Sequence, residues 1–196
     1  MNARTAPATA ASRRSEARER LLDTAAGLFY AEGVRAVGVD RLIAEAGITK
    51  ATFYRHFPGK DELVLAYLDR RDRDVRERLA AAAAASPDPR STLAVLVAAL
   101  ADEVCGPGFR GCPFINAAAE YPDADHPVRR LVAAHRRWFR DALADLLTAC
   151  GHLDPAGGAA ALLLLRDGAM VAGYLDGTET RDRITATAAA LLGPLP

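Results

Sequence analysis

The stretch "ITKATFYRHFPGKDEL", Ile48–Leu63, decides the fold of the amino-terminal third of the chain. Thr49 is a favourable N-cap residue, so a short helix is predicted to begin directly after it. Phe53 and Phe57 are four residues apart and therefore share one face, which marks the buried side of this helix. A Pro-Gly pair then breaks the helix, and the sequence Lys-Asp-Glu-Leu begins the next one.

A second short helix is predicted just before this stretch, over about residues 40–46, and Gly47 ends it. Two short helices joined by a tight turn form a helix-turn-helix, whose second helix lies in the major groove of DNA. The residues predicted to pack inside the unit are Leu42, Ile43, Ala46, Ile48, Phe53 and Phe57. The outward residues are small, polar or basic, as a groove-facing helix requires: Thr49, Lys50, Ala51, Thr52, Tyr54 and Arg55.

The rest of the chain is also predicted to be helical. Apolar residues recur at helical spacing, and no run alternates with the period of two that a half-buried strand shows. The first helix is predicted to start with Ser15 as its N-cap and to end at Gly33. The later helices are predicted over about residues 60–85, 90–104, 113–121, 127–150, from Asp154-Pro155 onward, and from Thr178 or Thr180 to Gly193. We therefore predict an all-α fold.

The charge differs between the two ends of the chain. The 196 residues have a formal net charge of zero, which argues against a general nucleic-acid binder. However, residues 1–60 carry ten basic and six acidic residues, whereas residues 61–196 carry fifteen basic and nineteen acidic residues. This asymmetry indicates that only the amino-terminal end contacts a polyanion. The sign-alternating stretch "DRRDRDVRER", residues 69–78, is predicted to be a solvated helix face with local ion pairs.

The sequence favours a cytoplasmic protein. Its three cysteines, Cys105, Cys112 and Cys150, are sparse and odd in number, which is typical of the reducing cytosol. The first residues lack the apolar stretch of a signal peptide. The longest apolar run, over residues 155–165, stops at a charged pair and is shorter than the about 20 residues that cross a bilayer. No membrane contact is therefore expected.

The ordered pattern over about residues 18–68 resembles the tetracycline-repressor (TetR) family of transcription regulators. The resemblance rests on "LLDTAAGLFYAEG" and "LIAEAGITKATFYRHFPGKDELV". The second segment follows the family's order of motif residues from the Ala-Gly turn to the Lys-acid-acid-Leu start of the next helix. The opening residues 1–14 are predicted to form a flexible basic arm. The resemblance implies a DNA-binding domain at 15–62 and a helical effector-binding and dimerisation domain at 63–196.

The resemblance also implies a role for each matching position in DNA binding. The matching residues are Thr49, Lys50, Ala51, Thr52, Tyr54, His56 and Lys60, and Arg55 is added as an outward basic residue of the same helix. The first of them caps the recognition helix and contacts a phosphate, and the next three face base edges. Tyr54, His56 and Lys60 grip the DNA backbone. The chemistry agrees, since a phosphate accepts hydrogen bonds from hydroxyl, imidazole and ammonium groups and is favoured at a helix N-terminus.

The second predicted helix departs from the family pattern. The family opens this helix with Thr or Ser, whereas this chain has "VGVDR" over residues 37–41. Asp40 can cap the helix, but its negative charge does not suit a phosphate. A phosphate contact from this helix is therefore expected only from Arg41.

The resemblance further implies a homodimer that binds a palindromic double-stranded operator. Its interface would be a four-helix bundle made by the last two helices of each subunit. The segments "AAALLLLRDGAMVAGYL" and "ITATAAALL" are apolar around more of their circumference than one core face needs, and their small residues allow close approach. Packing within one subunit is the alternative explanation.

A group of aromatic and isolated polar residues indicates a pocket for a small-molecule effector. The candidates are Phe109, Cys112, Phe114, Asn116, Glu120, Tyr121, His135, Trp138 and Phe139. Their segment G-C-P-x-x-N-A-A-x-E also looks similar to one branch of the TetR family. Ordinary core packing of the same aromatic residues is the alternative.

Other chemistry has little support in the sequence. The four histidines lack metal-ligand spacing, and no phosphate-binding glycine loop or nucleophile elbow is present, so no metal, cofactor or catalytic site is expected. Cys105 and Cys112 could form a redox switch, although buried inert thiols are the alternative. The resulting hypothesis is a repressor released by a small molecule. The competing hypothesis is a small-molecule-binding or catalytic protein, for example with a Cys112–His135 site, whose amino-terminal hairpin is only structural.

Overall fold

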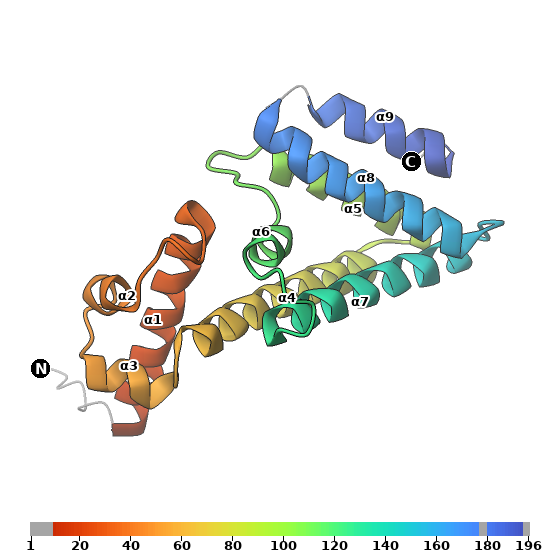
Figure 1. Ribbon diagram of the computed structural model, residues 1–196. Coiled ribbons are helices and arrows are strands. Elements are labelled where there is room, and N and C mark those ends of the chain that lie inside the picture. Colours follow the sequence, from red (N-terminus) through yellow and green to blue (C-terminus); the bar gives the residue numbers. More distant parts are fainter. Residues whose placement is uncertain (1–9, 177–179, 194–196) are drawn as a thin grey trace, which may run out of the picture. The chain divides into compact units, whose positions relative to one another are not determined.

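The computed structural model describes residues 10–176 and 180–193, and these residues form helices joined by short loops (Figure 1). The described helices are α1 (Ala10–Glu32), α2 (Val39–Glu45), α3 (Lys50–His56), α4 (Lys60–Ala85), α5 (Pro89–Val104), α6 (Pro113–Glu120), α7 (Pro127–Ala149), α8 (Pro155–Leu175) and α9 (Thr180–Leu192). The described residues contain no strand, so the predicted all-α fold is confirmed.

The chain divides into two compact units, one up to Leu68 and the other from Asp69 onward, and α4 contributes to both. The boundary predicted at 62/63 lies earlier, within the first turn of α4. The first turns of α4 belong to the first unit because their apolar side chains are buried in its core. Tyr67, for example, is 2% exposed and packs edge-on against Phe29 of α1, with 5.9 Å between the ring centroids.

Helix α1 begins at Ala10, upstream of the N-cap predicted at Ser15. The flexible arm predicted over 1–14 is therefore wrong for residues 10–14, and residues 1–9 lie outside the described part of the chain. Residues 10–14 read Ala-Ala-Ser-Arg-Arg, and alanine and arginine are strong helix formers that extend a helix already begun. At its other end α1 stops at Gly33, whose φ of 92° is left-handed and favours glycine.

Helix α2 is capped differently from the prediction. Its N-cap is Gly38, in extended conformation, with no side-chain cap hydrogen bond. Asp40 lies inside the first turn, so the prediction that it caps the helix is wrong. The helix begins at Val39, one residue before the predicted start. The Asp40 carboxylate in the first turn still interacts favourably with the helix dipole.

The second unit is a bundle in which α8 packs against α5, α7 and α9 (Figure 1). Its core contains a cluster of buried side chains, Leu93, Leu143, Leu147, Ala159 and Leu162. Proline stands at the start of α5, α6, α7 and α8, where its missing N–H leaves no hydrogen bond unmade. Gly173 of α8 lies so close to α5 that an added Cβ would stand 2.5 Å from the Cβ of Val104.

By length and composition alone, α8 could cross a membrane, whereas no membrane contact was expected from the sequence. Such a helix is weak evidence, because the core helices of bundles pass the same test. Arg166 and Asp167 lie in the middle of α8, and Asp167 pairs with Arg136 of α7. Charged side chains at this depth are costly in lipid, so the structure favours α8 as a packing helix of the second unit.

Candidate DNA-binding surface and effector site

Helix α3 is held in place by its N-cap and by two buried aromatic rings. The Thr49 hydroxyl accepts a hydrogen bond from the Thr52 amide at 3.2 Å, which confirms the predicted cap. Phe53 and Phe57 are 0% and 3% exposed, and their ring centroids are 6.5 Å apart. Because these two rings anchor one face, the opposite face of α3 points to solvent.

The solvent-facing side of α3 carries the predicted base contacts. Lys50 and Ala51 are exposed, whereas Thr52 is half-buried and its hydroxyl lies 2.9 Å from that of Thr49. Arg55 donates to the same Thr52 hydroxyl at 3.4 Å. Lys50 and Ala51 are therefore exposed to solvent, while Thr52 is held in a local hydrogen-bonded network.

The residues predicted to contact the DNA backbone lie at the end of α3 and the start of α4. Tyr54 is 48% exposed, and its ring packs edge-on against Phe53 at 5.1 Å, which limits the directions its hydroxyl can take. His56 and Lys60 are half-buried. Lys60 is the first residue of α4, where the helix dipole also favours an anion.

Arg41 forms ion pairs that were not expected from the sequence. Its guanidinium binds the Glu32 carboxylate through two nitrogens, one of them at 2.8 Å, and its Nε lies 3.9 Å from Glu45. The hydrogen bond to Glu32 raises the pKa of Arg41, and the same bond lowers the pKa of Glu32. Both side chains are exposed, so the pair adds little stability, and a phosphate contact by Arg41 requires exchange of this partner.

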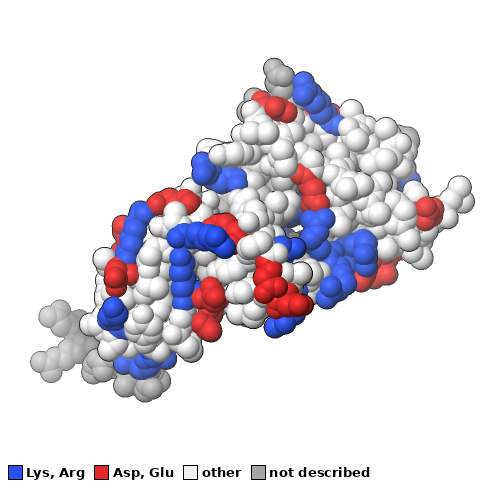
Figure 2. All heavy atoms as spheres, in the orientation of Figure 1, with Lys and Arg blue, Asp and Glu red and all other residues white. Residues whose placement is uncertain are grey.

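An acidic side chain also lies beside the first residue of the recognition helix α3. The Lys50 ammonium lies 3.7 Å from the Asp40 carboxylate of α2, and both side chains are exposed. Acidic and basic side chains are intermixed over the face of the first unit seen in Figure 2. The i,i+4 spacing of Arg41 and Glu45 was visible in the sequence, but the Glu32 and Asp40 partners depend on how the helices pack.

The second unit has a polar cluster around His135 of α7. His135 is 4% exposed, its Nδ1 lies 2.6 Å from the Asp72 carboxylate of α4, and its ring stacks on Phe114 of α6 at 3.7 Å. Burial lowers the pKa of His135 despite the hydrogen bond to Asp72. Burial alone would raise the pKa of Asp72, but hydrogen bonds from Arg76 and His135 outweigh it and lower that pKa. Near neutral pH we therefore assign a neutral imidazole that donates from Nδ1 to a carboxylate.

Two further aromatic residues of α7 complete one side of this cluster. Arg76 places its guanidinium 3.9 Å from the centre of the Trp138 ring while its Nε donates to Asp72 at 2.7 Å. Phe139 faces the guanidinium of Arg166 at 5.4 Å. The prediction that residues 69–78 form only a solvated face is therefore wrong in part, because Asp72 and Arg76 turn toward α7.

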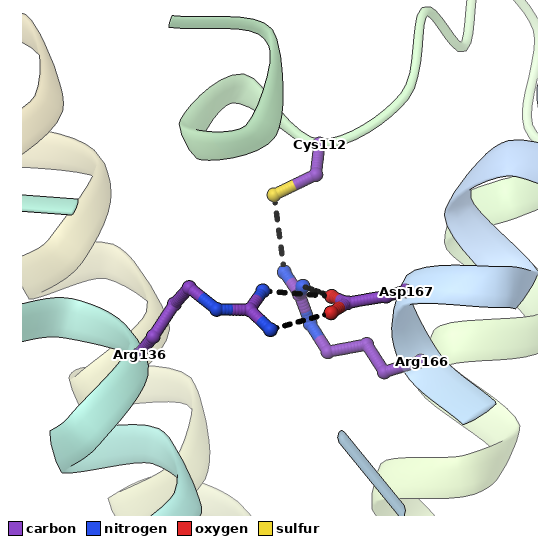
Figure 3. Close-up of polar contacts among 4 residues, drawn as sticks. All are labelled: Cys112, Arg136, Arg166 and Asp167. Atoms are coloured by element: carbon purple, nitrogen blue, oxygen red, sulfur yellow. Dashed lines mark hydrogen bonds and ion pairs between the residues drawn. The ribbon is translucent and has the colours of Figure 1, made fainter. Parts of the chain in front are cut away.

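Arg166 and Asp167 of α8 form the other side (Figure 3). Arg136 binds Asp167 with two hydrogen bonds of 3.0 and 2.6 Å. Arg166 donates to Asp167 at 3.3 Å and to the sulfur of Cys112 at 3.4 Å, and Cys112 is 2% exposed at the start of α6. The sequence pattern did not indicate these pairings, because Arg166 and Asp167 only mark the end of an apolar run there.

The remaining predicted effector residues lie at the ends of α6. Asn116 donates to the Arg110 carbonyl at 2.8 Å and so orders the preceding loop. Phe109 is half-buried in that loop, and Tyr121 packs against His126 at 4.5 Å beyond the helix. Glu120 is the last residue of α6. The structure therefore brings together Phe114, His135, Trp138 and Phe139, with Cys112 joined through Arg166.

A separate depression of about 410 Å³ lies where the α7–α8 turn meets α5 and α9. It is lined by Arg90, Leu93, Leu147, Cys150, Gly151, His152, Leu153, Asp154, Leu191 and Leu192. None of the predicted effector residues lines it. Within the described part of the chain, no group of three or more His, Cys, Asp or Glu residues is arranged to hold a metal ion.

The fold and the exposed face of α3 define a helix-turn-helix DNA-binding protein. The profile of bacterial regulatory proteins of the tetR family matches residues 21–67, and that of the tetracyclin repressor-like C-terminal domain matches residues 89–189. The chain belongs to the TetR family of transcription regulators. Both the predicted resemblance and the predicted regulatory function in DNA binding are thereby confirmed.

Solved structures of this family are similar over nearly the whole chain. SCO4454, a TetR-family transcriptional regulator from Streptomyces coelicolor, is 48% identical with a TM-score of 0.88, covering 91% of this chain and 95% of that one. A TetR transcriptional regulator from Chloroflexus aurantiacus is 25% identical with a TM-score of 0.81, covering 93% and 97% of the two chains. Among curated relatives, the HTH-type transcriptional regulator LmrA of Bacillus subtilis is 28% identical over 63% of this chain and 67% of its own length.

Proposed function

We propose that the protein is a cytoplasmic repressor that binds a palindromic operator as a homodimer and is released by a small-molecule effector. The observation that carries the proposal is the pairing of a solvent-facing recognition helix in the first unit with a buried polar and aromatic cluster in the second. The effector would favour a dimer in which the spacing of the two recognition helices no longer fits DNA. Its differential affinity for the two forms limits the size of the response.

An exposed apolar stripe on α8 supports the dimer. Leu164, Val171 and Leu175 are 72%, 53% and 70% exposed and recur at helical spacing, and Gly168 lies between them with open space around it. A helix of one subunit that covers this stripe in its partner would bury all three side chains. Such an interface is self-complementary under two-fold symmetry. The resulting dimer would hold its two recognition helices about 34–36 Å apart, the distance between successive major grooves.

Operator binding is expected to depend steeply on salt. About 6–8 phosphate contacts per dimer predict a slope of log affinity against log salt concentration near −5 to −7. The measurement is fluorescence anisotropy with a labelled duplex from the promoter region of the protein's own gene, at several salt concentrations. A flat response, or equal affinity for random duplex, would contradict the proposed function and favour a structural role for the amino-terminal hairpin.

Substitutions on the recognition surface are expected to separate base contacts from phosphate contacts. Lys60→Ala is expected to weaken binding to all sequences alike and to reduce the salt slope by about one unit per lost contact. Lys50→Ala should also relax preference at one position of each half-site, by about 1–3 kcal/mol. Anisotropy against a panel of single-position operator variants measures both effects. A uniform loss for Lys50→Ala would instead make that lysine a phosphate contact.

A further inference from the structure

Arg166 is a largely buried cation with poor partners. Its side chain is 15% exposed, yet its contacts to Asp167 and to the Cys112 sulfur are long, at 3.3 and 3.4 Å (Figure 3). The same Asp167 carboxylate already receives two shorter hydrogen bonds from Arg136. A guanidinium has five N–H donors, sulfur is a weak acceptor, and a buried charge is stable only with well-placed partners. Arg166 therefore retains the capacity to bind an anion.

His135 presents the complementary group, a hydrogen-bond acceptor on a largely buried side chain. With Nδ1 donating to Asp72, the Nε2 of the neutral imidazole carries a lone pair. No described residue hydrogen-bonds this Nε2, although the side chain is 4% exposed. The hydrogen bond of Nδ1 to Asp72 and the stacking of the ring on Phe114 together fix the position of Nε2. This lone pair can therefore accept a hydrogen bond from a ligand that supplies a donor.

The side chains around Arg166 and His135 indicate the charge and the shape of the ligand. Three guanidiniums, those of Arg76, Arg136 and Arg166, stand against two carboxylates in this cluster, those of Asp72 and Asp167. With His135 neutral, the cluster has one surplus positive charge, which favours an anion over a cation. The flat faces of Phe114, Trp138 and Phe139 favour a planar apolar body.

We propose that the effector is a planar organic acid with a hydrogen-bond-donating hydroxyl group, whose anionic group is bound by Arg166 and whose hydroxyl donates to Nε2 of His135. This inference rests on the proposed function, because it describes the chemistry of the molecule that would release the operator. It requires Arg166 to exchange its long contacts for a bidentate pair, which arginine forms readily with carboxylates.

The chain offers a reporter inside this site, because Trp138 is its single tryptophan. We would label the full-length protein with 5-fluorotryptophan and follow the one ¹⁹F NMR signal during titration with 2-, 3- and 4-hydroxybenzoate. At least one isomer is expected to shift the signal saturably. The matching hydroxybenzamide, which is neutral, and the matching methoxybenzoate, which lacks the hydroxyl donor, should each bind at least about ten-fold more weakly. The proposal is overturned if no isomer binds, or if either analogue binds as tightly as the parent acid.

A matched pair of variants locates the anion contact. Arg166→Gln is expected to weaken binding of the same hydroxybenzoate at least about ten-fold. Arg130→Gln, which removes the same charge from an exposed position on α7, should change it less than about two-fold. Equal losses in both variants would overturn the role of Arg166. If Arg166→Gln alters the helical content, the two ligand analogues decide the question in the unaltered protein.

Operator binding is measured separately, so the two proposals fail in different ways. Binding of a hydroxybenzoate that leaves operator affinity unchanged would overturn the assignment of this site to the effector. Release of the operator by neutral or cationic molecules, but by none of these acids, would overturn the inference and leave the proposed repressor intact. Failure to bind the operator under any condition would overturn the proposed function, whatever the ¹⁹F titration shows.

Discussion

Replacing Val171 by arginine is expected to convert the protein into a monomer and to remove measurable operator binding. Val171 is 53% exposed in the middle of the apolar stripe of α8. In the proposed interface the partner subunit would cover this side chain, so the substitution would place a positive charge in an apolar contact on each subunit. A monomer binds only one half-site and loses the avidity of the pair, which is worth about 10²–10⁴ in affinity.

The measurements are light scattering after size-exclusion chromatography and anisotropy with the operator. Ala84→Arg is the matched control, because Ala84 is exposed on α4 and lies outside the α8 stripe. It should leave both the mass and the operator affinity unchanged. A Val171→Arg protein that still has the mass of a dimer and full affinity would place the interface elsewhere.

Phe53→Ala is expected to destabilise the helix-turn-helix by about 3–5 kcal/mol. Phe53 is 0% exposed and packs against Phe57 and Tyr54, so its removal leaves a cavity where α3 is anchored to the first unit. This loss is comparable with the whole stability of a small domain, and DNA binding should disappear with it. Hydrogen exchange of the α1–α3 amides measures the change in local stability.

Tyr54→Phe separates folding from binding on the same helix. It removes only an exposed hydroxyl, so the amide protection of the first unit should remain within about 0.5 kcal/mol. Operator affinity should nevertheless fall for all sequences alike, because the phosphate contact proposed for this hydroxyl would be lost. If Phe53→Ala and Tyr54→Phe gave the same protection, Phe53 would not be the anchor of α3.

Intramolecular ion pairs on the DNA-binding surface are expected to lower its affinity for DNA. Arg41 is bound by Glu32, and Lys50 lies beside Asp40. A phosphate bound by Arg41 would have to displace Glu32, and a base edge bound by Lys50 would have to displace Asp40. Such exchange of partners lowers the net gain from each proposed contact, and exposed pairs are weak enough to permit it.

The helices and their ends were largely predictable from the sequence, because they depend on residues that are close together in the chain. The Thr49 cap, the breaks at Gly33 and Gly47, and the prolines that begin α5 to α8 act within one turn. The ordered recognition-helix pattern is local in the same way, and it was sufficient to predict the family. The predicted start of α1 was wrong because strong helix formers extend the helix upstream of Ser15, a favourable cap residue.

Only the tertiary structure decided which charged and polar side chains pair inside the second unit. His135 and Asp72 are 63 residues apart, and Arg136 and Asp167 are 31 residues apart, so no periodic pattern connects them. Their pairing depends on how α4, α7 and α8 are rotated about their axes when they pack, and this rotation is set by the shapes of many buried side chains together. The sequence by itself determined a TetR-type DNA-binding domain and an all-helical fold. The partners of each buried charge, and with them the acid-binding chemistry proposed for Arg166 and His135, emerged only when distant helices were brought into contact.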